Sequence, residues 1–301
     1  MNAAVPHEVL AAAQLPPPHR PVRAFMARLW REKPLGAIAA AVFLLFVFCG
    51  IFADLLAPYG FNEIAPIERL KAPSLKHLFG TDNLGRDMFS RCLYGARLSV
   101  IIGLSAAALA TLISVLIGIF TGYLGGKVDM LVQRIVDAYM SFPELVILIA
   151  VVSVVGPGMF QIIGVLSLVL GIGGSRIIRS AVVSARENMY VHAAQSIGAS
   201  TGRILWRHLL PNIMPPIIVL FTTRVGAVIL VESGLSFLGL GVPPPAPTWG
   251  GLLSGSGRTY LFQGPWLALA PGLCLTTVVY ATNVFGDALR DLLDPRMRGS
   301  K

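Results

Sequence analysis

Charged side chains are scarce in this sequence. Asp, Glu, Lys and Arg make up 13% of the 301 residues and hydrophobic residues make up 55%, whereas an ordinary soluble domain carries about 25% charged residues. So few charges cannot cover the water-facing surface of a chain of this length. The composition therefore excludes an ordinary soluble domain and indicates that the bilayer is the solvent.

Groups that carry enzyme chemistry are also missing. The three cysteines (Cys49, Cys92 and Cys274) are not at metal-ligand spacing, so neither a disulfide framework nor a metal site is predicted. The five histidines form no paired-ligand pattern, and no Gly-x-Ser-x-Gly motif occurs. The nearest approach to a phosphate-binding loop, residues 122–128, has Thr121 and Val128 where Gly and Ser or Thr are needed. We expect no enzyme and no cofactor in this chain.

Long apolar runs are what the sequence does contain. A spanning helix needs about 20 mostly apolar residues. Six segments meet this length, which predicts an all-α, polytopic membrane protein with six transmembrane helices. The predicted spans are Leu35–Ala57, Leu98–Phe120, Arg134–Val155, Met159–Ile178, Asn212–Glu232 and Trp266–Asp287. The third is interrupted by Arg134, Asp137, Pro143 and Glu144.

The basic residues predict the orientation. With the N-terminus inside, sixteen Lys and Arg fall in inner segments and seven in outer segments, which places both termini in the cytoplasm. This distribution explains the net charge of +9 better than a nucleic-acid-binding face does. The expected organisation is a flexible basic cytoplasmic tail (1–34), a first transmembrane helix (35–57), an extracytoplasmic loop (58–97), a core with the other five helices (98–289, including an inner loop at 179–211) and a second cytoplasmic tail (290–301).

The inner loop has an unusual composition. Glu187–Ser196 is predicted to be a short helix, Gly198 interrupts it, and Thr201–Leu210 is predicted to form a second helix that ends at Pro211. Composition alone leaves two alternatives open, a helix pair outside the membrane and an amphipathic hairpin on the lipid headgroups.

The same stretch resembles the inner-membrane permeases of bacterial ABC importers. Their cytoplasmic signature is Glu-Ala-Ala, then Gly, then Leu-Pro, and within the family Tyr190–Ala194 is similar to the DppC/OppC branch for dipeptides and oligopeptides. His192 and Gln195–Ile197 depart from the pattern. Four other stretches match in order between residues 79 and 296: residues 79–99, residues 134–143, residues 232–250 and residues 286–295.

The resemblance implies an ABC type I importer permease fold in a bacterial cytoplasmic (inner) membrane. It also implies a second homologous permease subunit, two cytoplasmic ABC ATPase subunits that bind ATP and Mg²⁺, and an extracytoplasmic substrate-binding protein. The implied cargo is a short peptide, and the alternatives are nickel, glutathione or another small solute. An ion-driven secondary transporter is a more distant alternative, because we find no repeat between the two halves.

The resemblance further implies that residues 187–211 form coupling helices that insert into a groove on a cytoplasmic ATPase. Ala193 and Ala194 would keep one face thin for a partner's backbone, and Gly198 would set the angle between the helices. The expected coupling residues are Glu187, Tyr190, Ala193, Ala194, Gly198, Ala199, Arg203, Leu210 and Pro211.

Charges inside the predicted spans are candidates for the translocation path, since a buried charge in a bilayer is costly. Arg224, Glu232 and Glu144 either line the path and meet the charged ends of a peptide, or play structural roles. The structural alternatives are an ion pair between helices and, for Glu232, extension of the side chain to the membrane surface. Asp82, Arg86 and Asp87 form a charged extracytoplasmic motif that either ties its loop together or contacts the binding protein.

Overall fold

The computed structural model describes residues 21–293, and side chains from residue 25 onward. Within this range the chain is helical, and its only β-pairing is an isolated bridge between Thr81 and Asp87. The principal helices are α2 (Pro21–Glu32), α3 (Pro34–Ile51), α5 (Met88–Leu124), α6 (Gly126–Met140), α7 (Glu144–Val155), α8 (Met159–Arg186), α9 (Met189–Ser196), α12 (Met214–Phe237) and α14 (Trp266–Leu293). The short ones are α4 (Ala53–Leu56), η1 (Pro66–Glu68), α10 (Thr201–Arg203), η2 (Ile204–Leu209), α11 (Leu210–Asn212), α13 (Trp249–Leu252) and η3 (Leu253–Gly257).

Five helices in the described range (α3, α5, α8, α12 and α14) are long and apolar enough to cross a bilayer. The predicted third span is not one straight helix. It consists of α6 and α7, which meet at an angle of 87° and together make a possible sixth crossing. Pro143 stands immediately before α7, and proline restricts the residue before it to extended conformations, so the helix cannot continue through this point.

The centre of the bundle is a close pair, α5 and α8, which share the most extensive contact in the fold. Glycines permit the approach: a Cβ on Gly118 would lie 2.7 Å from the Ile178 Cβ, and one on Gly171 would lie 2.8 Å from the Ile113 Cβ. Both helices extend beyond the predicted spans, because α5 begins ten residues before Leu98 and α8 continues eight residues past Ile178. A helix of 37 residues such as α5 is about 55 Å long.

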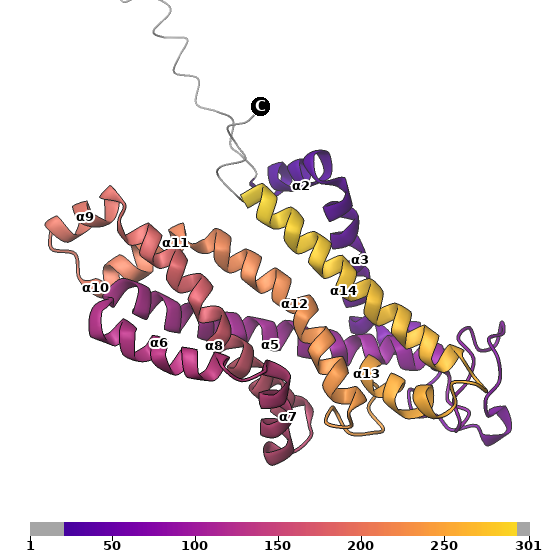
Figure 1. Cartoon of the computed structure of the whole chain (residues 1–301). Helices are drawn as coiled ribbons and strands as arrows, with labels where there is room; N and C mark the ends of the chain where they lie inside the picture. Colours follow the sequence, from indigo (N-terminus) through magenta and orange to yellow (C-terminus); the bar gives the residue numbers. More distant parts are fainter. Residues whose placement is uncertain (1–20, 294–301) are drawn as a thin grey trace, which may run out of the picture.

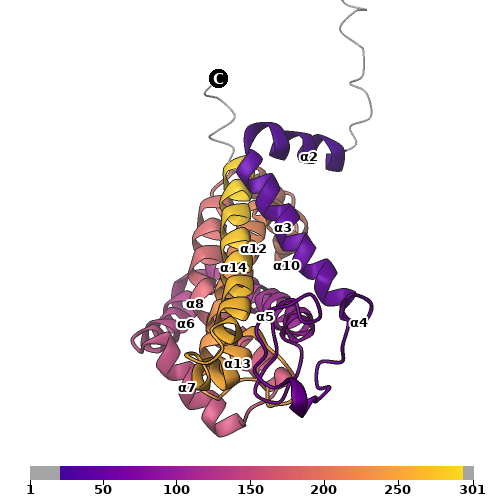
Figure 2. The same cartoon turned by 90° about the vertical axis from the view of Figure 1, so that its right-hand side faces the viewer.

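Two long polar segments lie at opposite ends of this bundle (Figure 1). Residues 58–87, here called the outer loop, precede α5. Residues 187–212, here called the inner segment, join α8 to α12. α2 and the last turn of α14 lie together at the end away from the outer loop (Figure 2), joined by the ion pair between Lys33 and Asp291.

Three boundary predictions need correction. Residues 21–32 of the expected flexible tail form the helix α2, because Leu29 packs against Ala288 and Leu292 of α14. The inner loop begins at residue 187 and not at 179, since α8 runs to Arg186. Pro211 does not end the second short helix, because helix continues through α11 to Asn212. Residues 1–20 and 294–301 lie outside the described residues.

Candidate functional site

The inner segment is a bent pair of short helices. Asn188 precedes α9, and Gly198 follows α9 with a φ of 77°, a left-handed conformation that costs glycine little. The Ala199 N–H donates to the Ala194 carbonyl at 3.0 Å, which closes the end of α9. The Ser200 Oγ accepts the Arg203 N–H at 3.4 Å and so caps α10. These local contacts establish the bend that the sequence predicts at Gly198.

One side of the inner segment is packed firmly against the bundle. Its apolar residues form one cluster with the inner halves of α5, α8 and α12. The buried residues contributed by the segment itself are Val191, Ala194, Ile204, Leu205 and Leu209. A hydrogen bond from the Gln195 Nε2 to the Tyr123 hydroxyl at 3.5 Å adds to this anchorage, and at the end of α8 the Arg186 Nη1 donates to the Gly122 carbonyl at 3.1 Å. The segment therefore has a fixed position on the bundle.

The other side of the inner segment exposes large apolar side chains. Met189, Ile197 and Trp206 are all exposed, and Ile197 is 85% exposed. A rigid segment with apolar residues on its free side is typical of a surface that a partner covers. The sequence interpretation did not select these three residues. Their apolar character among polar neighbours is a signal in the sequence, but only the structure shows that they face away from the bundle.

The predicted coupling residues divide between the two sides. Glu187, Tyr190, Ala193, Gly198, Arg203 and Pro211 are exposed, whereas Ala199 and Leu210 are half-buried. Ala194 is buried in the chain's own core. The expectation that both alanines keep a thin face for a partner is therefore wrong for Ala194, because consecutive residues on a helix point in different directions. Of the two alanines, only Ala193 has an exposed side chain.

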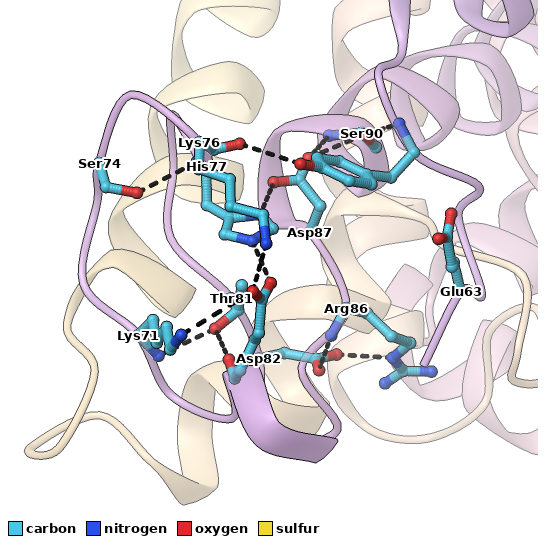
Figure 3. Close-up of polar contacts among 12 residues, drawn as sticks. Glu63, Lys71, Ser74, Lys76, His77, Thr81, Asp82, Arg86, Asp87 and Ser90 are labelled. Carbon is cyan, nitrogen blue, oxygen red and sulfur yellow. Dashed lines mark hydrogen bonds and ion pairs between the residues drawn. The ribbon is translucent and has the colours of Figure 1, made fainter. Parts of the chain in front are cut away.

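The outer loop is a network of polar contacts (Figure 3). Asp82 is fully buried: its Oδ1 accepts the N–H groups of Leu84 and Arg86 at 2.8 and 3.0 Å, and its Oδ2 accepts the Arg86 Nε at 2.7 Å. Asp87 accepts the N–H of Ser90 at 2.8 Å and thereby caps α5. Both predicted aspartates thus organise the backbone at the entrance to α5.

His77 and Glu68 belong to the same network and were not predicted from the sequence. The Nδ1 of the buried His77 lies 2.9 Å from the Asp87 Oδ1, and its Nε2 lies 2.6 Å from the Glu68 Oε2. Glu68 also pairs with Lys76, and this ammonium, with His77, lowers the pKa of Glu68 to about 2. The contacts are those expected if the charged motif ties its own loop together.

Arg224, in the middle of α12, reaches across to the α5–α8 pair. Its Nη1 donates to the Ser114 Oγ at 2.9 Å and its Nη2 donates to the Leu170 carbonyl at 2.6 Å. Gly174 makes room for it, because a Cβ there would lie 1.5 Å from the Arg224 Nη2. Among the described residues no carboxylate forms an ion pair with this guanidinium. Arg224 therefore joins three helices through neutral oxygens.

The two carboxyl groups predicted with Arg224 lie in different surroundings. Glu232 does not extend to the surface: it is fully buried, and its Oε1 accepts the Ser236 hydroxyl at 2.7 Å. Glu144 is exposed in the first turn of α7, where the helix dipole favours a negative charge. Within residues 21–293 neither carboxylate has an ion pair, so the ion pair between helices, one of the structural alternatives, is not found. Whether the three groups line a path stays a hypothesis.

Membrane-spanning helices, together with a rigid, partly apolar segment exposed at one end, define this chain as a multi-pass membrane component of a larger assembly. A comparison with family models matches residues 114–299 to "Binding-protein-dependent transport system inner membrane component". This match covers more than half of the chain, which thus belongs to that family. Members are transport components that act with binding-protein and ATPase subunits, and they are not themselves enzymes.

Several relatives are similar along nearly the whole chain. The dipeptide transport system permease protein DppC of Alkalihalophilus pseudofirmus is 40% identical, with 89% of this chain and 90% of that protein covered. The oligopeptide transport system permease protein OppC of Bacillus subtilis is 38% identical, with 89% and 88% covered. The di/tripeptide transport system permease protein DppC of Pseudomonas aeruginosa is 37% identical, with 88% and 89% covered.

Among solved structures, the inward-facing MetNI methionine ABC transporter contains a similar chain. The TM-score is 0.52 at 17% sequence identity, and the alignment covers 69% of this chain and 98% of the other. At this identity the similarity concerns the fold alone. It agrees with the ABC importer permease fold expected from the sequence.

Proposed function

We propose that this chain is one permease subunit of an ABC importer for short peptides. It pairs with a second, homologous permease in the bacterial inner membrane, with both of its termini in the cytoplasm. Two ATPase subunits bind ATP and Mg²⁺ and dock on the inner side of the complex, where the inner segment of this chain inserts into a groove on an ATPase. An extracytoplasmic binding protein delivers the peptide at the end of the molecule that carries the outer loop.

The observation that carries the docking proposal is the two-sided character of the inner segment. Buried side chains hold it on α5, α8 and α12, while Ile197 and its exposed apolar neighbours face away. A partner that binds the exposed side of the inner segment can move the inner ends of α5, α8 and α12 together, because the segment is packed against all three helices. The names of the relatives, which concern dipeptides, oligopeptides and di/tripeptides, support the choice of cargo.

Isolation of the assembly tests the proposal. The tagged chain, purified from its native membrane in mild detergent, is expected to bring down two ATPase polypeptides, a second permease and a binding protein. Reconstituted in proteoliposomes with Mg²⁺–ATP on the ATPase side, the complex should take up a labelled dipeptide. Unlabelled di- and tripeptides should compete. Competition by nickel or glutathione in place of peptides would contradict the cargo, and recovery of the chain without ATPases would contradict the importer itself.

A further inference from the structure

We propose that α2 is an interfacial helix that rests on an anionic lipid leaflet beside the end of the first span. This inference goes beyond the transport function, and it rests on the proposed topology only for the side of the membrane. The exposed face of α2 contacts lipid at the boundary between acyl chains and headgroups, and Arg28 and Arg31 lie at the level of the lipid phosphates.

The position of α2 is fixed by contacts with two spans. Leu29 is buried in a small cluster with Ala37 of α3 and with Ala288 and Leu292 of α14. The Lys33 Nζ lies 2.5 Å from the Asp291 Oδ2 at the junction of α2 and α3. Figure 2 shows α2 lying across the end of α3 and α14 instead of continuing the direction of α3. A helix held in this way is parallel to the membrane surface where α3 and α14 emerge from it.

The faces of α2 have the distribution of an interfacial helix. At 100° per residue, Phe25, Leu29, Met26 and Trp30 occupy one continuous apolar arc. Leu29 and Phe25, which form one half of that arc, pack against α3 and α14. The other half, Met26 and Trp30, is exposed, and Trp30 is 62% exposed. Tryptophan is the residue enriched at membrane–water interfaces, and apolar side chains next to a spanning helix are suited to lipid.

The opposite face is basic. Arg31 is exposed, and Arg28 forms an ion pair with Glu32 at 3.1 Å on the same face. Apolar exposure on one side and arginine on the other is the composition of helices that lie in the headgroup region. A cytoplasmic leaflet carries anionic lipids that attract basic side chains near its surface. Charge complementarity therefore favours an anionic leaflet over a protein partner.

Fluorescence of the full chain in lipid nanodiscs tests the proposal. The difference between the spectra of the wild-type chain and Trp30→Phe isolates the Trp30 signal. We expect lipids brominated near the headgroup end of the acyl chain to quench most of it, and aqueous iodide to quench little. Trp206 on the inner segment, 52% exposed, is the matched control. Its signal, isolated with Trp206→Phe, should be quenched strongly by aqueous iodide and little by the brominated lipids.

A second measurement tests whether the basic residues of α2 favour anionic lipid. In discs of one composition, the bromine is placed either on phosphatidylglycerol or on phosphatidylcholine. Trp30 should be quenched more strongly by brominated phosphatidylglycerol, and Arg31→Gln should reduce this preference roughly fivefold, the factor that corresponds to about 1 kcal/mol. Iodide quenching of Trp30 would place α2 in water, and protection from both quenchers would place it under protein. Equal quenching by the two lipids would overturn the anionic leaflet. Each of these results contradicts the proposal.

Discussion

The outer loop and the inner segment are both polar stretches at the ends of spanning helices, yet different kinds of side chain hold them in place. In the outer loop, charged groups are buried and bind one another: Asp82 with Arg86, and Asp87 with His77. In the inner segment, apolar residues are exposed, as at Met189 and Ile197. Both regions expose apolar side chains, with Ile67 and Leu75 among those of the outer loop, but the inner segment has no comparable network of buried charges and is held on the bundle chiefly by apolar packing.

This difference separates the contributions to folding and to assembly. A buried carboxylate that accepts several hydrogen bonds is costly to remove, so the outer loop stabilises the entrance to α5 in the isolated chain. The exposed side of the inner segment has few contacts to lose. Substitutions there should leave the chain folded and act only on its complex. Four predictions test this separation.

The largest effect is expected for Ile197→Asp. A charge in the centre of the proposed ATPase contact cannot be desolvated without a large free-energy cost, so ATPase co-purification and ATP-driven uptake should fall to background. The thermal unfolding temperature of the chain should remain within error, because Ile197 makes no buried contact. The measurements are pull-down, proteoliposome uptake and unfolding monitored in detergent.

The matched control is Leu75→Asp, the same chemical change at a fully exposed position of the outer loop. It should retain full ATPase co-purification and unchanged stability. If both variants lose the ATPases, or if neither does, then the two ends do not differ as proposed.

The second prediction concerns a substitution in the outer loop that should affect folding and not ATPase binding. Asp82→Ala removes a fully buried carboxylate and leaves the N–H groups of Leu84 and Arg86 and the Arg86 guanidinium without their acceptor. Breaking a buried pair of this kind costs about 3–5 kcal/mol, so the unfolding temperature and the yield of folded chain should fall strongly. Chain that does fold should still bring down the ATPases. A variant of normal stability that fails to bind the ATPases would contradict the assignment of Asp82 to folding.

The sequence predicted the members of these two regions unequally, for physical reasons. Residues adjacent along the chain were found readily: the bend at Gly198 and the charged motif at Asp82, Arg86 and Asp87 follow from local composition. The bend between α6 and α7 was not predicted: the third span was expected to be one helix although Pro143 interrupts it, and the neighbouring helices determine how far a broken helix turns. The partners of Arg224 could not be predicted, since Ser114 and Leu170 are 110 and 54 residues away.

The outward direction of Ile197 and Trp206 was equally inaccessible from the sequence. Residues 204–209 form a π-helix (η2), and its wider turn changes which side chains share a face compared with the α-helix that a sequence pattern assumes. Which side of the segment faces the bundle depends on its contacts with α5, α8 and α12, and these contacts are not given by helical periodicity. Ala194 illustrates the same limit in α9, where only packing against the bundle distinguishes it from Ala193.

The third prediction concerns Arg224, which lies between the two regions. Arg224→Gln removes both hydrogen bonds to α5 and α8 and should cost about 1–3 kcal/mol of stability. If Arg224 joins the helices, uptake of every peptide should fall by the same factor, whatever the peptide's charge. If it meets the C-terminal carboxylate of the cargo, uptake of ordinary peptides should fall more than uptake of C-terminally amidated peptides, which lack that carboxylate. Uptake of each peptide at the wild-type rate would exclude both roles.

The smallest effect is expected for pH acting on Glu68 in the outer loop. Its pKa is lowered from 4.5 to about 2, first by Lys76 and then by His77. Above pH 4.5 the carboxylate is charged in both the folded and the unfolded chain, so its full stabilisation is present. As the pH falls from 4.5 to about 2, the unfolded chain takes up the proton first, and the stabilisation is lost. Between pH 5 and 8 Glu68 therefore adds no pH dependence.

Comparison with Glu68→Gln isolates this contribution from the other carboxylates of the loop. The Gln side chain cannot ionise. The difference between wild type and variant in the free energy of opening of the outer loop should therefore be constant from pH 8 to 5 and should decrease steadily toward pH 2. Hydrogen exchange of residues 58–87 is the suitable measurement, because it reports opening of the loop and not of the whole bundle. The inner segment should show no such decrease in the same samples. A difference in the outer loop that stays constant down to pH 2 would mean that Lys76 and His77 do not hold Glu68 in its charged form.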